Sequence, residues 1–258
     1  MRSALGVIPA RLGSTRLPRK PLHRLAGRPL IEWVWRRVLA ADLFASVVIA
    51  TDSEEIATVA RGFGATVEIT MSSHPSGTDR VAEVARNRAF AGFEYIVNIQ
   101  GDEPFVRPEH LARALDLVRD DGWEIGTVAS PLGSLESWRD PSVVKVVRGE
   151  DGAALLFSRA PVPFVRDGEP TPEQLAGEPF LRHIGIYSYR RDALLRWVSR
   201  PESELERLER LEQLRPLAAG ARIGVAVVEP AEPGVDTAAD ADRAERRLIE
   251  LETTNAGI

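Results

Sequence analysis

The stretch that decides the fold is Leu5-Gly-Val-Ile-Pro-Ala-Arg-Leu-Gly-Ser-Thr-Arg-Leu-Pro-Arg-Lys-Pro-Leu22, a short apolar run followed by a basic loop. Residues 5–8 are typical of a buried strand, and residues 29–41 are typical of a helix, since proline is favoured in the first turn. A basic loop that leads from a strand to a helix is expected at the ligand-binding edge of an α/β sheet. The stretch therefore predicts an α/β fold with an anion site in this loop.

Strand and helix patterns keep alternating after this stretch. Further strands are expected at residues 46–50, 66–69, 95–99, 125–129, 182–189 and 223–228. Further helices are expected at residues 52–63, 79–91, 108–119, 192–198, 204–217 and 238–251. The first of these helices is expected to start with a capping box at Asp52-Ser-Glu-Glu55. The alternation predicts a mostly parallel sheet with helices on both faces, a three-layer α/β/α arrangement.

The pattern changes in the middle of the chain. Residues 143–147 and 153–157 predict a hairpin, and an irregular, proline-rich stretch covers residues 161–179. The region around residues 140–180 is therefore a candidate arm for contact with a second copy. Residues 1–258 are otherwise predicted to form a single domain.

Composition narrows the class of ligand. The first 31 residues hold seven Lys and Arg and no acid, whereas the whole chain of 258 residues has a formal net charge of -5. A local cationic run in an acidic chain favours a specific anionic ligand over a nucleic-acid surface. The chain has no cysteine, which excludes thiolate metal sites, and no apolar run of membrane-spanning length. These features predict a soluble cytoplasmic protein that binds neither nucleic acid nor membrane.

The basic loop is predicted to hold a nucleotide triphosphate. It combines small residues for close backbone approach with cations, namely Gly13, Ser14, Thr15, Arg11, Arg16, Arg19 and Lys20. It has neither the Walker spacing nor the glycine pattern of dinucleotide sites, so side-chain charge must supply most of the binding. The alternative, a solvated basic loop, is less favoured because prolines fix the loop at the end of a strand.

Two carboxylates are candidates for a metal site. Asp102 lies in Gln100-Gly-Asp-Glu-Pro104, directly after the predicted strand 95–99, and Asp236 lies in a second glycine-containing loop after strand 223–228. Mg²⁺ binds proteins through one or two carboxylates together with substrate phosphates. Asp102 and Asp236 therefore predict such a site, although Gly-Asp-Glu-Pro is also an ordinary turn composition.

Two further polar groups can be interpreted in more than one way. Ser76 and Thr78 precede a predicted helix and either grip a hydroxyl-rich or anionic ligand or simply cap the helix. His183 and Tyr187 share one face of a predicted strand, where a lone histidine is more often a core residue unless a substrate carboxylate meets it. Neither group decides the function by itself.

Helix 204–217 is rich in charge. Glu206, Glu209, Glu212 and Gln213 alternate with Arg207, Arg210 and Arg215 at spacings of three and four. This pattern predicts a solvated face held by ion pairs, with one or two of the polar side chains facing a ligand. The chain shows neither a Ser-His-Asp arrangement nor a zinc-binding His-Glu-x-x-His, so nucleophilic hydrolysis and zinc chemistry lack support.

Taken together and in order, the motifs of this chain resemble those of the 3-deoxy-manno-octulosonate cytidylyltransferase (CMP-Kdo synthetase) family. They are Ile8-Pro-Ala-Arg11, Ser14-Thr-Arg-Leu-Pro18, Lys20-Pro-Leu22, Ala50-Thr-Asp52, His74, Ser76-Gly-Thr-Asp-Arg80, Gln100-Gly-Asp-Glu-Pro104, Phe180-Leu-Arg-His-Ile-Gly-Ile-Tyr187, Leu211-Glu-Gln-Leu-Arg215 and Gly234-Val-Asp-Thr237. Each motif alone is weak, but the ordered set spans nearly the whole chain and is specific.

The resemblance implies a Mg²⁺-dependent, usually dimeric nucleotidyltransferase with a nucleotide-diphospho-sugar-transferase-like fold. Such an enzyme activates 3-deoxy-D-manno-octulosonate (Kdo) with CTP and releases CMP-Kdo and pyrophosphate for lipopolysaccharide biosynthesis. The anomeric hydroxyl of Kdo would attack the α-phosphorus of CTP in line with departing pyrophosphate. One alternative is a cytidylyltransferase for a related sugar acid, such as an 8-amino Kdo analogue or a sialic acid. Another is a catalytically silent nucleotide-binding module.

The resemblance also implies roles for individual residues. CTP would be contacted by Ala10, Arg11, Ser14, Lys20, Arg80 and Gln100. The sugar acid would be surrounded by Arg80, Gln100, His183, Tyr187, Glu212 and Gln213. Asp102 and Asp236 would hold Mg²⁺, and Lys20, Arg16 and Asp102 would be catalytic. Residues 143–164 would form the dimer contact. The family often has glycine where this chain has Arg19, so Arg19 would alter the loop path or add a phosphate contact.

Overall fold

Two compact units make up the chain in the computed structural model, which describes residues 4–255. Unit 1 takes the chain up to Gly92, then Asn98–Pro108, and then the chain from Glu232 onward. Unit 2 takes Phe93–Val97 and Glu109–Ala231. Compactness does not say whether a unit folds by itself, so the single domain over residues 1–258 stays a prediction.

The sheet of unit 1 is parallel. Strand β1 (Ala4–Ala10) pairs with β4 (Ser46–Thr51), and β4 pairs with β5 (Thr66–Ile69). β1 and β4 are almost wholly buried because both are runs of aliphatic side chains, which is the pattern of strands covered on both faces. The three predicted strands are confirmed.

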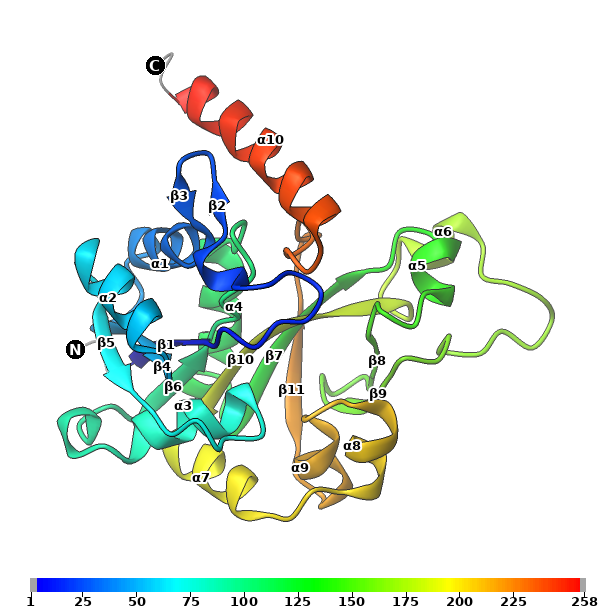
Figure 1. Ribbon diagram of the computed structural model, residues 1–258. Coiled ribbons are helices and arrows are strands. Elements are labelled where there is room, and N and C mark those ends of the chain that lie inside the picture. Colours follow the sequence, from blue (N-terminus) through cyan, green and yellow to red (C-terminus); the bar gives the residue numbers. More distant parts are fainter. Residues whose placement is uncertain (1–3, 256–258) are drawn as a thin grey trace. The chain divides into compact units, whose positions relative to one another are not determined.

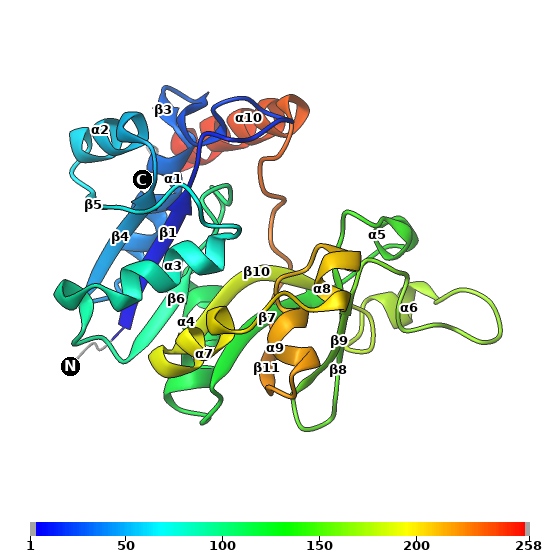
Figure 2. The same ribbon diagram turned by 60° about the horizontal axis from the view of Figure 1, so that its bottom comes forward.

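Helices cover both faces of this sheet. In Figure 2, α3 (Gly77–Arg86) crosses in front of β1 and β4, whereas α1 (Leu30–Ala40) lies behind them. Helix α2 (Glu54–Gly62) packs on β4 and β5. Unit 1 thus has the predicted layers of helix, parallel sheet and helix.

The ends of α2 and α3 differ from the prediction. Ser53, not Asp52, caps α2, because its hydroxyl accepts the Ile56 N–H. Helix α3 starts two residues early, since Ser76 caps it by accepting the Asp79 N–H. It ends at Arg86, and the 3-10 turn η2 (Arg88–Phe90) follows, because the Asn87 side chain caps that new turn.

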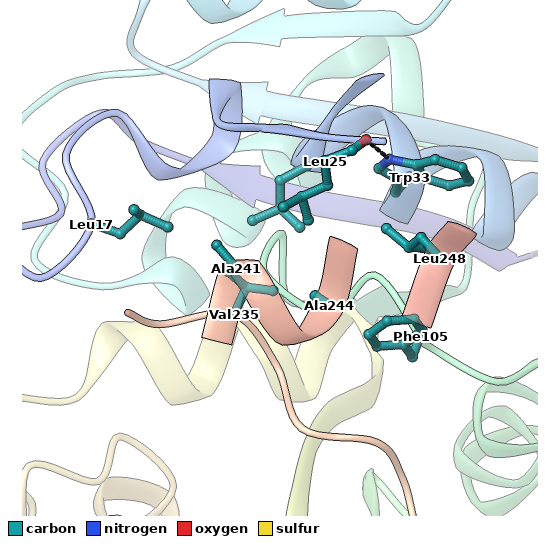
Figure 3. Close-up of a cluster of buried hydrophobic side chains, with 9 residues drawn as sticks. Leu17, Leu25, Trp33, Phe105, Val235, Ala241, Ala244 and Leu248 are labelled. Carbon is teal, nitrogen blue, oxygen red and sulfur yellow. Dashed lines mark hydrogen bonds between the residues drawn. The ribbon is translucent and has the colours of Figure 1, made fainter. Parts of the chain in front are cut away.

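A buried apolar cluster ties the basic loop to the C-terminal helix. In Figure 3, Leu17 from the loop, Leu25 from β2 (Arg24–Leu25) and Trp33 from α1 surround Ala241, Ala244 and Leu248 of α10 (Ala238–Asn255). Phe105 and Val235 complete the contact. The Trp33 indole donates to the Leu25 carbonyl (2.8 Å), which fixes the β2–β3 hairpin, β3 being Arg28–Pro29.

The strands of unit 2 form a mixed sheet (Figure 1). Its strand order is β11 (Ile223–Val227), β7 (Ile125–Pro131), β10 (Leu181–Arg190) and β6 (Tyr95–Asn98). β11 runs parallel to β7, whereas β10 runs antiparallel to it. Helices α4 (Pro108–Arg119) and α7 (Arg191–Ser199) belong to the α/β pattern here. The fold is therefore α/β with a mostly parallel sheet, as the sequence predicts.

The predicted hairpin is confirmed as β8 (Lys145–Arg148) and β9 (Ala154–Ser158), which pair antiparallel. The fully buried Lys145 fixes the ends of this hairpin. Its ammonium donates to the backbone carbonyls of Asp140 (2.9 Å), Val143 (2.6 Å) and Arg159 (2.7 Å). Three carbonyls satisfy the three donors of an ammonium group, so the buried charge is solvated by backbone.

Two expectations for unit 2 are wrong. The stretch 161–179 is not wholly irregular: Thr171 forms a capping box that starts α6 (Pro172–Leu175), and Leu175 packs with Trp138 of α5 (Leu135–Arg139). The helix expected at 204–217 is two helices, α8 (Glu204–Glu209) and α9 (Leu214–Ala218). Arg210 breaks them apart in the left-handed conformation, at φ 54°.

Candidate active site

Three segments of unit 1 bring Lys20, Asp102 and Asp236 together. Lys20 starts the 3-10 turn η1 (Lys20–Leu22), Asp102 follows β6, and Asp236 precedes α10. Each lies within three residues of a member of the buried cluster, namely Leu17, Phe105 and Val235. The core that holds the three loops therefore also fixes the three charged side chains.

Close backbone contacts join the two acidic loops. The Val235 N–H donates to the Asp102 carbonyl (2.9 Å). A β-carbon at Gly234 would lie 3.2 Å from that carbonyl oxygen and 2.9 Å from the Glu103 carboxylate. A β-carbon at Gly101 would lie 2.9 Å from the Pro9 carbonyl oxygen at the end of β1. Gly101 needs glycine, because the clash there is with backbone. At Gly234 the nearest atom belongs to the flexible end of Glu103, and the Asp102 carbonyl leaves only a tight fit.

The Lys20 ammonium lies between the two carboxylates. Its Nζ is 2.5 Å from Asp102 Oδ2 and 2.9 Å from Asp236 Oδ1. Burial opposes the charge on Lys20, but the two carboxylates outweigh burial and raise its pKa above the ordinary value. Arg16 approaches the same Asp236 oxygen at 3.2 Å. Two carboxylates and two cationic side chains thus lie together in one small polar centre.

The donor chemistry of this centre fits a hard divalent cation. Asp102 and Asp236 present carboxylate oxygens to one common cation, here the Lys20 ammonium. Within residues 4–255 no group of three His, Asp or Glu side chains is arranged to hold a metal. Mg²⁺ suits a pair of carboxylates, since it retains several waters and takes the remaining ligands from substrate phosphates.

The rest of the basic loop is arranged for an anion. The exposed Arg11 makes no ion pair within the described part of the chain, so its charge is available. Ala10, the last residue of β1, pairs with Thr51, and the Ser14 hydroxyl accepts the Leu17 N–H (3.3 Å). The loop thus places backbone groups and cationic side chains at the carboxyl end of a parallel strand.

The backbone conformation and the ion pair of Arg19 bear on the expectation that it alters the loop path or adds a phosphate contact. Its backbone is left-handed, at φ 57° and ψ 32°, a conformation that glycine adopts at little cost. Arg19 keeps the glycine-like path, and its guanidinium pairs with Glu55 on α2. A phosphate contact by Arg19 would require exchange of this exposed ion pair, so that contact stays a prediction.

Arg80 and Gln100 differ in how accessible they are. The Arg80 guanidinium is buried, donates to the Thr70 hydroxyl and lies 3.4 Å from Asp52. Gln100 is partly exposed, and its carbonyl accepts the Glu103 N–H (3.3 Å) in the turn before α4. The loop before α3 uses Ser76 as a cap, which is the structural alternative to a ligand contact. Arg80 is thus held within the protein, whereas Gln100 borders the acidic loop.

In unit 2, β10 carries a second polar group. The rings of His183 and Tyr187 have centroids 5.2 Å apart, next to Tyr189 and Trp197. The Thr127 hydroxyl donates to the Ile186 carbonyl (2.7 Å) and lies 2.9 Å from His183 Nε2. The Thr127 hydroxyl uses its one proton in the hydrogen bond to the Ile186 carbonyl, so it can only accept a hydrogen bond from His183. Nε2 of His183 therefore carries the ring proton, and Nδ1 remains an acceptor.

Burial sets the charge of this group. It lowers the pKa of His183 to about 3, so the ring is neutral near pH 7. Burial, Tyr189 and Glu212 together raise the pKa of Tyr187, which keeps its hydroxyl protonated. The buried Tyr187 hydroxyl has no hydrogen-bond partner among residues 4–255. A neutral acceptor and an unused donor suit a polyhydroxylated ligand more than a metal.

Glu212 and Gln213 lie in the turn between α8 and α9. This turn is fixed by a buried ion pair: the Arg215 guanidinium donates to Glu206 at 2.8 and 2.6 Å. Glu206 also closes a capping box with Ser203. The prediction that these charges form a solvated face is wrong for Glu206 and Arg215, because the break at Arg210 turns them inward.

Sequence reasoning missed several residues that orient the predicted ones. Thr127 fixes the tautomer of His183, and Glu206 with Arg215 fixes the turn that carries Glu212. Thr127 lies in an apolar strand and gives no separate signal. The Ser203-x-x-Glu206 spacing is a capping-box pattern, and it could have revealed the role of Glu206.

A basic loop and a carboxylate pair at the carboxyl ends of strands define an α/β protein that handles nucleotide phosphates. The comparison with known sequences makes this class specific. A sequence model of the family named cytidylyltransferase matches residues 5–223, and the chain belongs to that family. The resemblance found in the sequence is confirmed.

Individual relatives match over nearly their whole length. The 3-deoxy-manno-octulosonate cytidylyltransferase of Gemmatimonas aurantiaca is 47% identical over 253 residues, covering 98% of this chain and 96% of the relative. The protein of the same name from Chromohalobacter salexigens is 47% identical over 255 residues, covering 98% and 99%. Both alignments include nearly all of this chain.

Solved structures agree with this assignment. CMP:2-keto-3-deoxy-manno-octonic acid synthetase complexed with CTP has a TM-score of 0.86 and 37% identity, covering 96% of this chain and 98% of that one. The 4-diphosphocytidyl-2C-methyl-D-erythritol synthase of Anaerococcus prevotii has a TM-score of 0.62 at 11% identity, over 95% and 97% of the chains. The second likeness shows the fold alone. None of the helices in residues 4–255 is long and apolar enough to cross a membrane.

Proposed function

We propose that this protein activates Kdo with CTP, forming CMP-Kdo and pyrophosphate for lipopolysaccharide biosynthesis. The observation that carries the proposal is the centre formed by Lys20, Asp102 and Asp236 beside the basic loop. Full-length relatives named for this activity, and a neighbour solved with CTP, support it.

The residues of unit 1 would act by positioning and charge neutralisation. Arg11, Arg16 and Lys20 would offset the charge that develops on departing pyrophosphate. Asp102 and Asp236 would hold Mg²⁺, which supplies Lewis-acid activation of the phosphate and of the attacking hydroxyl. Ala10, Ser14 and the turn at Gln100 would bind the nucleotide. Little covalent chemistry is required of the chain itself.

The residues of unit 2 would bind the sugar acid. His183 Nδ1 would accept from a sugar hydroxyl, because the ring is neutral and Nε2 is used by Thr127. The Tyr187 hydroxyl would donate to the sugar, while Glu212 and Gln213 would accept and donate at the adjacent turn. A neutral histidine has no charge to attract a carboxylate. Another cationic group would therefore have to bind the carboxylate of the sugar acid.

The role of Arg80 in ligand binding is indirect in this proposal. Its guanidinium is already engaged by Thr70 and Asp52. We infer that it orients the loop before α3 and meets nucleotide or sugar acid only if that engagement is exchanged.

Pyrophosphate release is the direct test. We expect release with CTP and Kdo, and little with UTP, ATP or GTP. A panel of sugar acids with CTP separates Kdo from an 8-amino analogue and a sialic acid. Absence of release with CTP and Kdo overturns the proposal, and absence with every pair indicates a silent nucleotide-binding module.

The metal ligands have their own test. Asp102→Asn removes one carboxylate charge while keeping the shape, so turnover should fall at least about 1,000-fold. Asp121→Asn, at an exposed position of unit 2, is the matched control and should retain activity. Circular dichroism checks that both variants fold. Most of the activity remaining in Asp102→Asn at saturating Mg²⁺ would refute its role.

We also propose a cytoplasmic homodimer that associates through the β8–β9 region. Leu155 and Phe164 are exposed by 62% and 81%, and both lie in the region that the sequence predicts as the arm for contact with a second copy. Leu155→Asp should convert a dimer to a monomer in light scattering coupled to gel filtration. Leu208→Asp, at a position 70% exposed on α8, is the control and should leave the mass unchanged.

A further inference from the structure

One cation, the Lys20 ammonium, already lies between the two carboxylates. The Lys20 side chain is only 16% exposed, and its Nζ donates to Asp102 at 2.5 Å and to Asp236 at 2.9 Å. These are charge-assisted hydrogen bonds in a partly desolvated place, which are stronger than exposed ion pairs. The Lys20 ammonium thus acts as the counterion that lets two acids lie side by side.

A divalent ion would bind the same two carboxylates. Mg²⁺ or Mn²⁺ bonded to both carboxylates would lie within a few ångströms of the ammonium, where two positive charges repel strongly. Lys20 must therefore leave before the metal can bind both acids. The basic loop provides its next partner, because a triphosphate held near Arg11 is an anion within reach of a lysine in the same loop.

We propose that Lys20 couples metal binding to nucleotide binding: it blocks the carboxylate pair until a triphosphate draws it away. This inference rests on the proposed function, since it takes Asp102 and Asp236 as the metal ligands. The coupling is reciprocal, so metal also favours the state in which Lys20 meets phosphate. The protein then avoids holding a divalent ion when no nucleotide is bound.

Mn²⁺ titration of the nucleotide-free protein, followed by electron paramagnetic resonance, tests this coupling. Lys20→Met removes the competing cation, so Mn²⁺ should bind about tenfold more tightly than to the wild type, or more. Lys20→Arg keeps the charge and should bind as weakly as the wild type. Arg19→Met is the matched control in the same loop, because Arg19 pairs with Glu55, and it should not change the affinity.

Thermal unfolding gives a second readout that does not depend on one variant. Without Lys20 the two carboxylates repel, so Lys20→Met and Lys20→Gln should melt lower than the wild type in chelator. Added Mg²⁺ should raise the melting temperature of both variants more than that of the wild type. Asp102→Asn in the Lys20→Met background should remove this gain and the tight Mn²⁺ binding.

Two failures can be told apart. If the wild type binds Mn²⁺ as tightly as Lys20→Met, and Asp102→Asn removes that binding, the coupling is wrong while the metal ligands stand. If no variant binds Mn²⁺, or if Asp102→Asn changes nothing, the assignment of the metal ligands in the proposed function is wrong, and the coupling fails with it.

Discussion

Arg19 shows how one backbone angle can decide which residue a loop prefers. Its φ of 57° is a conformation that side chains with a β-carbon adopt at a cost of about 1 kcal/mol or more. Because alanine keeps this cost, we expect Arg19→Gly to be more stable than Arg19→Ala by about 1 kcal/mol. Urea denaturation of the two variants measures the difference.

The same pair of substitutions at an ordinary position is the control for Arg19. At Arg61 in the last turn of α2, alanine should be the more stable of the two, because glycine is unfavourable in helices. If Arg19→Ala proves more stable than Arg19→Gly, the left-handed conformation is not what sets the preference.

The His183 ring by itself should make the stability of the protein depend on pH. Burial lowers its folded-state pKa to about 3, whereas the unfolded chain has the ordinary value near 6.5. Below pH 6.5 the unfolded state therefore takes up a proton that the folded state refuses. Stability should fall by up to about 1.4 kcal/mol per pH unit between pH 6.5 and 3, and should not change through this group above pH 7.

Two measurements check His183. Its ring resonances in NMR should not titrate between pH 8 and pH 4.5 in the folded protein, whereas in the urea-unfolded chain the His183 ring should titrate near pH 6.5. His183→Asn should flatten the pH dependence of urea unfolding relative to the wild type. A resonance of His183 that titrates near pH 6.5 in the folded protein would contradict the neutral ring.

The types of residue in the candidate site follow from the sequence, but their contacts do not. Basic residues after a strand and aspartates in glycine-containing turns indicate phosphate and metal chemistry by type alone. The sequence could not reveal that Lys20 lies between Asp102 and Asp236, because 82 and 216 residues separate those partners and only the packing of the core sets the distance. Likewise, the sequence does not reveal that Arg80 lies beside Thr70 and Asp52.

Elements were predicted best where hydrophobic runs are long. The strands of both units follow from apolar patterns, and α4 starts and ends where expected. The helix expected at 204–217 failed because each half has good helix-forming residues, and no proline or glycine marks the break at Arg210. The break is imposed by tertiary structure: Glu206 and Arg215 gain a buried ion pair that a continuous helix would not allow.

This ion pair leads to a prediction for the α8–α9 element. Glu206→Gln and Arg215→Met should each destabilise the protein by about 3 kcal/mol, because each leaves a buried charge without its ionic partner. The double variant should cost clearly less than the sum, since it removes both charges. Equilibrium unfolding in urea measures all three, with Glu204→Gln in the exposed pair with Arg207 as a control expected to change little.

Activity separates the role of this pair in the turn from its role in stability. If the turn positions Glu212 and Gln213, both single variants should raise the KM for the sugar acid more than the KM for CTP at a temperature where they are folded. Equal changes in both constants would indicate a general loss of structure instead.

At the scale of the whole molecule, the chain is divided between the two units in an interleaved order. The N-terminal loop, the Asp102 turn and the Asp236 loop all belong to unit 1, although they are far apart in the sequence. The β10 cluster and the α8–α9 turn belong to unit 2. The proposed nucleotide residues and most of the proposed sugar-acid residues therefore fall in different units.

This division predicts which segments each ligand protects from hydrogen exchange. CTP with Mg²⁺ should slow exchange of amides in unit 1, at residues 10–20, 100–104 and 233–237, because backbone there holds the phosphates and the acidic loops. Kdo alone should slow exchange around residues 183–187 and 210–213 of unit 2. Mass spectrometry of peptides from the free and liganded protein measures both, with GTP as the control nucleotide. CTP protection confined to unit 2, or GTP protection equal to that by CTP, would contradict the assignment of the nucleotide to the basic loop.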